Sequence, residues 1–383
     1  MSSRLTKGLI TSIALISTLS IMAFAPKEQK YRDELRPIMQ TLFVSVQEVL
    51  PYYLDRSEFQ DEKNAEKISK LLGNIQEHAK AIDGKTADYD EEMKLYGANF
   101  ETDAIGAHQS FQRKAYGQSY FYLEEVLTTC FSCHASRASE KDSKFADLTG
   151  KIDWDKVGEF NKPKLFTISR QFDKAAKEYE NMILDRGLSM EELLHFDPFL
   201  NYLILTIRVK DDKARALKLV KQALKKPYPR ILKKDLEVWR DSLENLTKEE
   251  KANQKPNLKR AEDLIAKGKS QMDYPRDQSG MVYYIEASRV LKQLLVSTEN
   301  PADQANVSYL LGLSELVIGN AFIGLEAQRY FEQAIRLQPK SVLAKRAFDL
   351  YEENLIYGYS GSSGLHLPAS EKAKLEDLRK KAY

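Results

Sequence analysis

Apolar residues in the first third of the chain recur at alternating steps of four and three, and this spacing constrains the fold more than any other feature. Three such series can be traced. They are Leu35, Met39, Leu42, Val46, Val49 and Tyr53; Ala65, Ile68, Leu72, Ile75, Ala79 and Ile82; and Tyr116, Tyr120, Leu123, Leu127, Cys130 and His134. A four-three repeat is typical of antiparallel helices that pack at shallow angles. The sequence therefore predicts a helical bundle over residues 31–140, with each series facing inward.

The number of helices in this bundle depends on Gly117. The second helix is predicted to stop at Asp83-Gly84, and a loop with little periodicity follows. A third helix is predicted between about Ala98 and Tyr116, with Gly117 as the turn into the last helix. If one helix instead continues through Gly117, the bundle has three helices rather than four.

Composition agrees with an all-α fold. The 383 residues include only 17 glycines and 12 prolines, and long segments are rich in Ala, Leu, Glu, Lys and Arg. The 43% hydrophobic and 30% charged content is typical of a soluble globular chain, whose length allows two or three domains. A formal net charge of +2 argues against nucleic-acid binding, which depends on a strong basic excess.

Residues 1–25 have the layout of a secretory signal peptide. Arg4 and Lys7 form a positive start, an apolar stretch covers 9–22, and small residues follow at Ala23 and Ala25. Because a proline follows Ala25 and would hinder a peptidase there, cleavage after Ala23 is the alternative. The sequence predicts export to the periplasm. If neither site is cut, the segment becomes a short anchor in the inner membrane.

Both cysteines of the chain lie in the stretch Cys-Phe-Ser-Cys-His, residues 130–134. On a helix, positions i and i+3 share a face, and i+4 extends that face. Two thiols at this spacing can be alkylated by the two vinyl groups on one edge of a porphyrin, and the adjacent histidine can reach the iron from the same side. The pattern predicts one covalent haem c, with Cys130 and Cys133 as thioether anchors and His134 as the proximal axial ligand.

Other interpretations of the motif are weaker. A zinc site needs two more nitrogen or sulfur ligands, and the remaining histidines show no paired spacing. They are His78, His108, His195 and His366. A thioredoxin-like dithiol needs a strand-helix context, which this helical stretch does not offer. A bare disulfide stays open as an alternative, although a bridge across two residues constrains little chain entropy.

With this motif near its end, the segment 31–140 resembles the class II c-type cytochromes, meaning cytochrome c′ and its low-spin relatives. The stretches "YLEEVLTTCFSCHASRA" and "YRDELRPIMQTLF" carry the resemblance. It implies a four-helix bundle with the haem motif on the last helix. It also implies that Met39, on the first helix, is the distal axial ligand, as in the low-spin members. In cytochrome c′ that position does not ligate, and the distal face is open.

The resemblance extends less clearly to the neighbouring residues. The family has a basic residue four positions after the histidine, whereas Arg137 comes after three; Arg137 is the candidate for a haem propionate contact. Arg36, one turn before Met39, is a second candidate, with a solvated helix charge as its alternative. Met39 is alternatively a plain core methionine. Met93 and His108 are then the reserve ligand candidates.

The rest of the chain is predicted to be a linker over 141–165, helix pairs over 166–358, and a flexible loop with a C-terminal helix over 359–383. In the helix pairs, one pattern recurs. An alanine is followed four positions later by a large residue and seven positions later by an apolar or small residue. The instances are Ala175, Tyr179 and Met182; Ala216, Val220 and Ala223; Ala287, Leu291 and Leu294; and Ala327, Phe331 and Ala334. Repeats of about 40 residues that pair helices mark an α-solenoid. A degenerate copy is expected near Ala261.

The best copy, "YLLGLSELVIGNAFIGLEAQRYFEQAIRLQPKS", resembles the tetratricopeptide pattern. Gly312 is predicted to let two helices approach closely, and Pro339 to end the second helix. The resemblance implies a concave surface that holds a partner protein. An ordinary helical bundle is the alternative.

Together these features predict an electron carrier and not an enzyme. Iron held by a histidine and a methionine suits electron transfer, in which the protein positions the cofactor and tunes its potential. The predicted partner is a redox protein, in solution or at the membrane, bound by the repeat domain. One alternative is a haem-based gas binder or sensor, if Met39 does not ligate. The other is a haem-free scaffold with the two cysteines in a disulfide.

Overall fold

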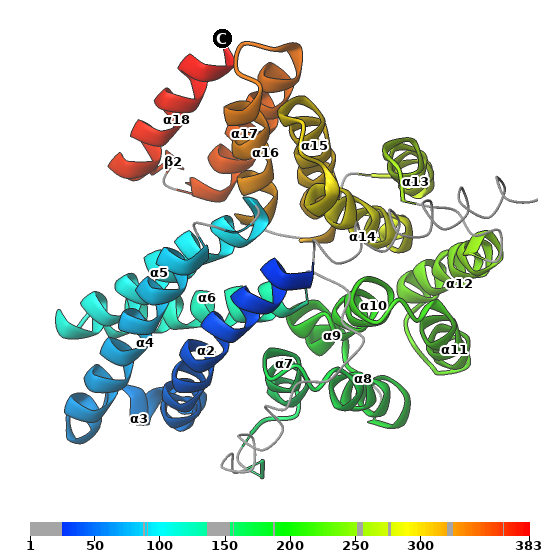
Figure 1. Cartoon of the computed structure of the whole chain (residues 1–383). Coiled ribbons are helices and arrows are strands. Elements are labelled where there is room, and N and C mark those ends of the chain that lie inside the picture. The colour runs from blue at the N-terminus through cyan, green and yellow to red at the C-terminus, as the bar shows by residue number, and fades with distance from the viewer. Residues whose placement is uncertain are drawn as a thin grey trace, which may run out of the picture. The chain divides into compact units, whose positions relative to one another are not determined.

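The chain is described here from a computed structural model (Figure 1). The structure describes residues 25–383 except 87–88, 90, 136–153, 156, 187, 251–255, 275–276, 320–324 and 363. Nearly all of this part is helical. Its only strands are β1 (Ser360–Gly361) and β2 (Gly364–Leu365), which pair antiparallel with Ser360 opposite Leu365. The prediction of an all-α fold is confirmed.

Contacts divide the chain into a first unit, residues 1–129, and a second unit, residues 130–383. The first unit contains α2 (Ala25–Leu54), α3 (Arg56–Gln60), η1 (Glu62–Asn64), α4 (Ala65–Thr86), α5 (Glu91–Gln112) and most of α6 (Tyr116–His134). Helix α4 packs extensively against both α2 and α5. The four-helix bundle itself remains a prediction.

Burial in the first unit follows the predicted periodicity. The buried apolar residues of its four long helices are Leu42, Phe43, Val46, Val49 and Leu50; Ile68, Leu71, Leu72, Ile75, Ala79 and Ile82; Tyr96, Phe100, Ala104, Ala107 and Phe111; and Leu123, Val126 and Leu127. The ends of the first and third predicted series are less buried, since Met39, Tyr53 and Tyr120 are partly exposed.

Three predicted helix boundaries in this unit are wrong. Helix α4 continues past Asp83-Gly84 to Thr86, and α5 begins at Glu91, so much of the expected loop is helical. The chain then turns at Lys114, which has a φ of 60°, and Gly117 lies within α6.

The turn at Lys114 is a helix end built without glycine. Ala115 N donates to the carbonyl of Ser110 at 2.9 Å, and Lys114 N donates to that of Phe111 at 2.9 Å. This pair of bonds satisfies carbonyls that a helix end would otherwise leave open, in the arrangement that usually has glycine at the left-handed position. The glycine at position 117 therefore predicted the turn at the wrong residue.

The second unit is a succession of helices (Figure 1). They are α7 (Asn161–Ile168), α8 (Phe172–Asn181), η4 (Met182–Arg186), α9 (Met190–Phe196), α10 (Pro198–Leu203), η5 (Ile204–Val209), α11 (Lys213–Ala223), α12 (Arg230–Glu250), α13 (Leu258–Gln271), α14 (Met281–Ser297), α15 (Pro301–Ile318), α16 (Leu325–Leu337), α17 (Val342–Tyr359) and α18 (Ala369–Ala382). Both η4 and η5 are π-helices. Neighbours in sequence pack together, most extensively from α13 to α17. A tetratricopeptide-like solenoid remains a prediction.

The expected close approach of two helices at Gly312 is confirmed. A Cβ built on Gly312 in α15 would lie 2.5 Å from a ring carbon of Phe331 in α16. Phe331 is fully buried, as are Ala327 and Ala334, its partners in the predicted repeat. Glycine therefore sets the separation between α15 and α16.

Most of the predicted signal peptide, residues 1–24, lies outside the described residues. Among the helices that are described, none is long and apolar enough to span a lipid bilayer.

Candidate functional site

The Cys-x-x-Cys-His motif forms the last turn of α6. Earlier in the helix Leu123 and Leu127 are buried, whereas Cys130, Cys133 and His134 are partly exposed. Both cysteines are thiols in the structure. Positions i, i+3 and i+4 of a helix share one face, so the two sulfurs and the imidazole are presented on the same side, where a planar ligand could reach all three.

A backbone carbonyl fixes the ring of His134. Its Nδ1 contacts the carbonyl oxygen of Ile168, the last residue of α7. Because a carbonyl oxygen can only accept, Nδ1 carries the proton and donates it. The lone pair of the neutral ring then lies on Nε2. Histidines that ligate metals commonly donate their other N–H to a backbone carbonyl in this way, which sets both tautomer and ring orientation.

The imidazole of His134 is neutral near pH 7. Burial and, to a lesser extent, the positive charge of Arg170 together lower the pKa of His134 to about 4, against the opposing effect of the Ile168 carbonyl. A metal-binding histidine must be deprotonated. The ring is therefore in the protonation state that a metal ligand requires.

The environment of Cys130 does not favour a thiolate. Burial, with a smaller contribution from Cys133, raises the pKa of Cys130 to about 12. The motif also lies at the C-terminal end of α6, where the helix dipole disfavours negative charge. Redox-active dithiols have lowered pKa values at helix N-termini or beside cations. These observations argue against thiol–disulfide exchange at this pair.

The last turn of α6 packs in the core of the second unit. Ala135, directly after the motif, is fully buried in the same hydrophobic cluster as Phe172 and Ile183, and Phe131 packs against that cluster. The sequence places the motif in a haem domain that ends at residue 140, and that domain assignment remains a prediction. What the sequence does not indicate is that residues after 160 surround the end of α6.

The other predicted haem contacts are placed as follows. Met39 lies on α2 in the first unit and is partly exposed. Arg36 is exposed, one turn earlier on the same helix. Arg137 lies outside the described residues. The assignment of Met39 as distal ligand and of either arginine as a propionate contact therefore remains a prediction.

The reserve ligand His108 is already hydrogen bonded. Its Nδ1 lies 2.8 Å from Oε1 of Gln76, and its Nε2 lies 3.2 Å from Nε2 of Gln112 and 3.5 Å from the hydroxyl of Ser69. Burial lowers the pKa of His108. This set of partners satisfies the ring without a metal. Met93, the other reserve candidate, is partly buried on α5.

No group of three or more His, Cys, Asp or Glu side chains suited to a metal ion occurs in the described part of the chain. Of the remaining histidines, His78 has its Nδ1 2.7 Å from the carbonyl oxygen of Asn74, four residues earlier in α4. His366 lies beside the strand pair, and its backbone N donates to the carbonyl of Tyr359 at 3.1 Å. The expectation that these histidines do not form a zinc site rests on their spacing in the sequence.

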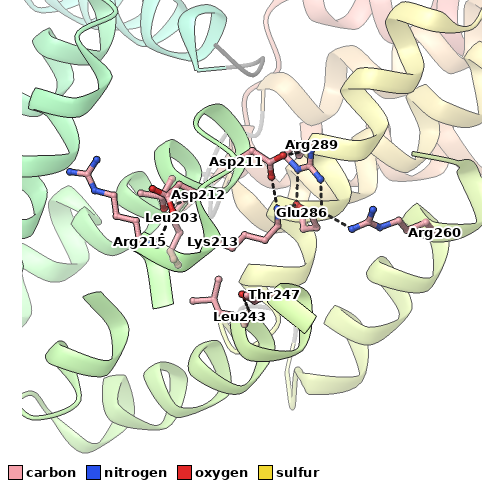
Figure 2. A network of polar contacts seen from close by, with 11 residues as sticks. Leu203, Asp211, Asp212, Lys213, Arg215, Leu243, Thr247, Arg260, Glu286 and Arg289 are labelled. Atoms are coloured by element: carbon pink, nitrogen blue, oxygen red, sulfur yellow. Dashed lines mark hydrogen bonds and ion pairs between the residues drawn. The ribbon is translucent and has the colours of Figure 1, made fainter. Parts of the chain in front are cut away.

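The sequence also gives no sign of a buried charge network in the second unit (Figure 2). The carboxylate of Glu286, on α14, is fully buried and accepts from Arg289 Nε at 2.8 Å and from Arg260 Nη2 at 3.0 Å. Lys213 Nζ, also buried, lies 3.4 Å from Glu286 Oε2. Arg289 Nη1 reaches Asp211 at 3.1 Å. Basic residues of this kind are normally solvated, so periodicity alone does not place them inside.

Comparisons with known proteins give no independent guide. No protein-family model matches the chain, and no curated protein or solved structure matches it. The resemblance to class II cytochromes and to tetratricopeptide repeats therefore stands on the residues already quoted.

Proposed function

We propose that this chain is an exported monohaem c-type cytochrome that carries electrons. Haem c would be held by thioethers to Cys130 and Cys133, with His134 as the proximal axial ligand. The observation that best supports the proposal is the contact from His134 Nδ1 to the Ile168 carbonyl. It leaves Nε2 as the metal-binding nitrogen, beside two thiols on the same face of α6.

Covalent attachment requires no oxidant. Each thiol would add across one vinyl group, with the sulfur on one vinyl carbon and the thiol hydrogen on the other. When bound, the haem would supply reversible one-electron chemistry. The two sulfurs would hold the edge of the porphyrin and His134 would present Nε2, while the Ile168 carbonyl orients the His134 ring.

Met39 is the proposed distal ligand. A thioether on the second axial position would raise the potential and leave little rearrangement between the two oxidation states, which suits electron transfer. If Met39 does not ligate, the open face would suit the alternative function, binding of small gases. The second unit would dock a redox partner, in line with its stack of helices.

A pyridine haemochrome assay tests the proposal directly. The full chain, made together with haem-ligation machinery, should contain one covalent haem. The Cys130→Ser/Cys133→Ser variant should contain none that resists acid extraction. His134→Gln should lose the absorption spectrum of haem iron with a histidine as axial ligand. His78→Gln, on α4, is the matched control and should keep that spectrum.

The outcomes separate the alternatives. Unmodified protein that lacks covalent haem, while a known c-type cytochrome made in parallel is loaded, would overturn the proposal and leave the scaffold interpretation. Covalent haem that binds carbon monoxide in the unmodified protein would favour the gas binder. Covalent haem that does not bind carbon monoxide would support the electron carrier.

A further inference from the structure

Arg208 is a buried cation that reaches the end of α6. It lies on η5, and its side chain is 3% exposed. Its Nε donates to the carbonyl oxygen of Ala135 at 3.0 Å. Ala135 directly follows His134, so this bond satisfies a carbonyl at the C-terminal end of the helix, where the last carbonyls have no partner within the helix. A cation is also favoured at this end by the helix dipole.

The guanidinium of Arg208 is itself held firmly. Its Nη1 donates to the two carboxylate oxygens of Glu315 at 3.0 and 3.3 Å and to the hydroxyl of Ser288 at 3.4 Å. The Ser288 hydroxyl donates to Glu315 at 2.6 Å. Lys292 Nζ lies 3.9 Å from Glu315 and donates to the hydroxyl of Tyr330 at 2.9 Å. The group that contacts Ala135 is thus anchored to α14, α15 and α16.

His134, the last residue of α6, and Ala135, which follows it, are therefore fixed by two separate parts of the second unit. His134 is held through the Ile168 carbonyl of α7, and Ala135 through Arg208 of η5. A π-helix inserts an extra residue into a turn and redirects the side chains that follow, and such segments are frequent at functional sites. Charged hydrogen bonds made within a buried site are stronger than those at a surface.

We propose that Arg208 is a positioning residue for the axial ligand, so that the second unit, to which the Cys-x-x-Cys-His motif belongs, orients this ligand as well as docking a partner. By holding the Ala135 carbonyl, Arg208 fixes the last turn of α6 and keeps the His134 N–H directed at Ile168. This inference rests on the proposed function, because it assigns His134 as an iron ligand. The hydrogen bond from Arg208 to the Ala135 carbonyl, which holds the end of α6, does not itself depend on haem.

The test uses the full chain in haem-free and haem-loaded forms. Because Arg208→Gln alone would leave Glu315 buried without its main partner, the Arg208→Gln/Glu315→Gln double variant is the informative one. Two facing amides keep the volume and remove both charges together. Arg215→Gln is the matched control, since Arg215 pairs with Glu180 at 2.7 Å and with Asp173 at 3.1 Å in the same unit.

In the haem-free Cys130→Ser/Cys133→Ser background, hydrogen exchange in the peptide containing 131–135 should be about tenfold faster or more in the double variant. The control should not change it. In the haem-loaded protein, the double variant should show a higher reduction potential, because a weaker N–H bond makes the imidazole a poorer electron donor to iron. Tryptophan fluorescence should show that the variant is still folded.

Each result decides a separate point. Unchanged exchange in the double variant would overturn the hold on α6. Faster exchange with an unchanged potential would reduce Arg208 to an ordinary helix cap and overturn its positioning role. Absence of covalent haem in the unmodified protein would overturn the proposed function and with it the ligand assignment, while the exchange measurement would still decide whether Arg208 holds the helix.

Discussion

Glu286→Gln should destabilise the second unit more than any other isosteric change in the network of Figure 2. The carboxylate lies within 3.4 Å of three buried cations, Lys213, Arg260 and Arg289. Asp211, the other acid of the cluster, has a side chain that is 44% exposed. With Glu286 neutral, Lys213 and Arg289 still pair with this partly solvated carboxylate, whereas Arg260 loses its ion pair with Glu286.

The size of the effect follows from burial. Removing one partner of a buried ion pair costs about 3–5 kcal/mol, because the remaining charge is left without compensation. Glutamine has nearly the same volume, so no cavity contributes. With a urea m-value of about 3 kcal/mol/M, the unfolding midpoint of this unit should fall by about 1–2 M.

Tryptophan fluorescence is the assay, because both tryptophans, Trp154 and Trp239, belong to the second unit. Trp239 is buried, and its Nε1 donates to the carbonyl of Gln278 at 2.8 Å, so unfolding changes its surroundings. Glu244→Gln is the control: Glu244 pairs with Lys221 at the surface at 2.8 Å, and its loss should leave the midpoint unchanged.

A second variant distinguishes charge imbalance from lost packing. Adding Arg260→Met to Glu286→Gln removes the cation that has lost its ion pair and should recover part of the lost stability. An unchanged or higher midpoint for Glu286→Gln would refute the reasoning that this carboxylate balances the cluster. Failure of Arg260→Met to recover any stability would show that the loss has another cause.

Three further predictions concern single sites. Gly312→Ala should lower the thermal midpoint in circular dichroism, since overpacking against Phe331 costs about 1–3 kcal/mol, more than the roughly 1 kcal/mol that alanine gains in a helix; a higher midpoint would contradict the close contact. Burial raises the pKa of Asp277, but hydrogen bonds from Asp273 N and from Ser279 outweigh it and leave this pKa below 3.8. Asp277→Asn should therefore be less stable than the unmodified protein at pH 6, with a difference in urea midpoint that shrinks as the pH falls below 4; a constant difference would argue against this. Met39→Ala should remove the methionine–iron band near the red end of the oxidised spectrum and allow carbon monoxide to bind; an unchanged spectrum would reject Met39 as ligand.

Features set by local periodicity could be predicted from the sequence. The buried stripes of α2 and α4 follow from four-three spacing, because a residue every turn must face the same neighbour. Gly312 could be predicted as a close approach because no other residue lacks a Cβ. The turn at Lys114 could not, because lysine in a left-handed conformation has no sequence signal and Gly117 nearby gave a false one.

The contacts around the motif could not be predicted for a different reason. The carbonyl of Ile168 is a backbone group that every residue possesses, and it meets a side chain 34 positions away. Arg208 lies 73 positions from Ala135, on a segment that pattern alone assigns to an ordinary helix pair. Long-range polar contacts of this type depend on how whole helices pack, and composition or spacing within one segment does not encode them.

These contacts bear on what the second unit is for. The Cys-x-x-Cys-His motif belongs to the second unit itself, and a unit that only docked a partner would not need to hold that motif through buried contacts. Phe131 and His134 of α6 and the following Ala135 are held in this way: Phe131 packs against the core, His134 contacts α7 and Ala135 contacts η5. Because Arg208 is tied through Glu315 to α15, and Gly312 sets how closely α15 approaches α16, a partner that shifts these helices would act on groups only a few bonds from the proposed ligand.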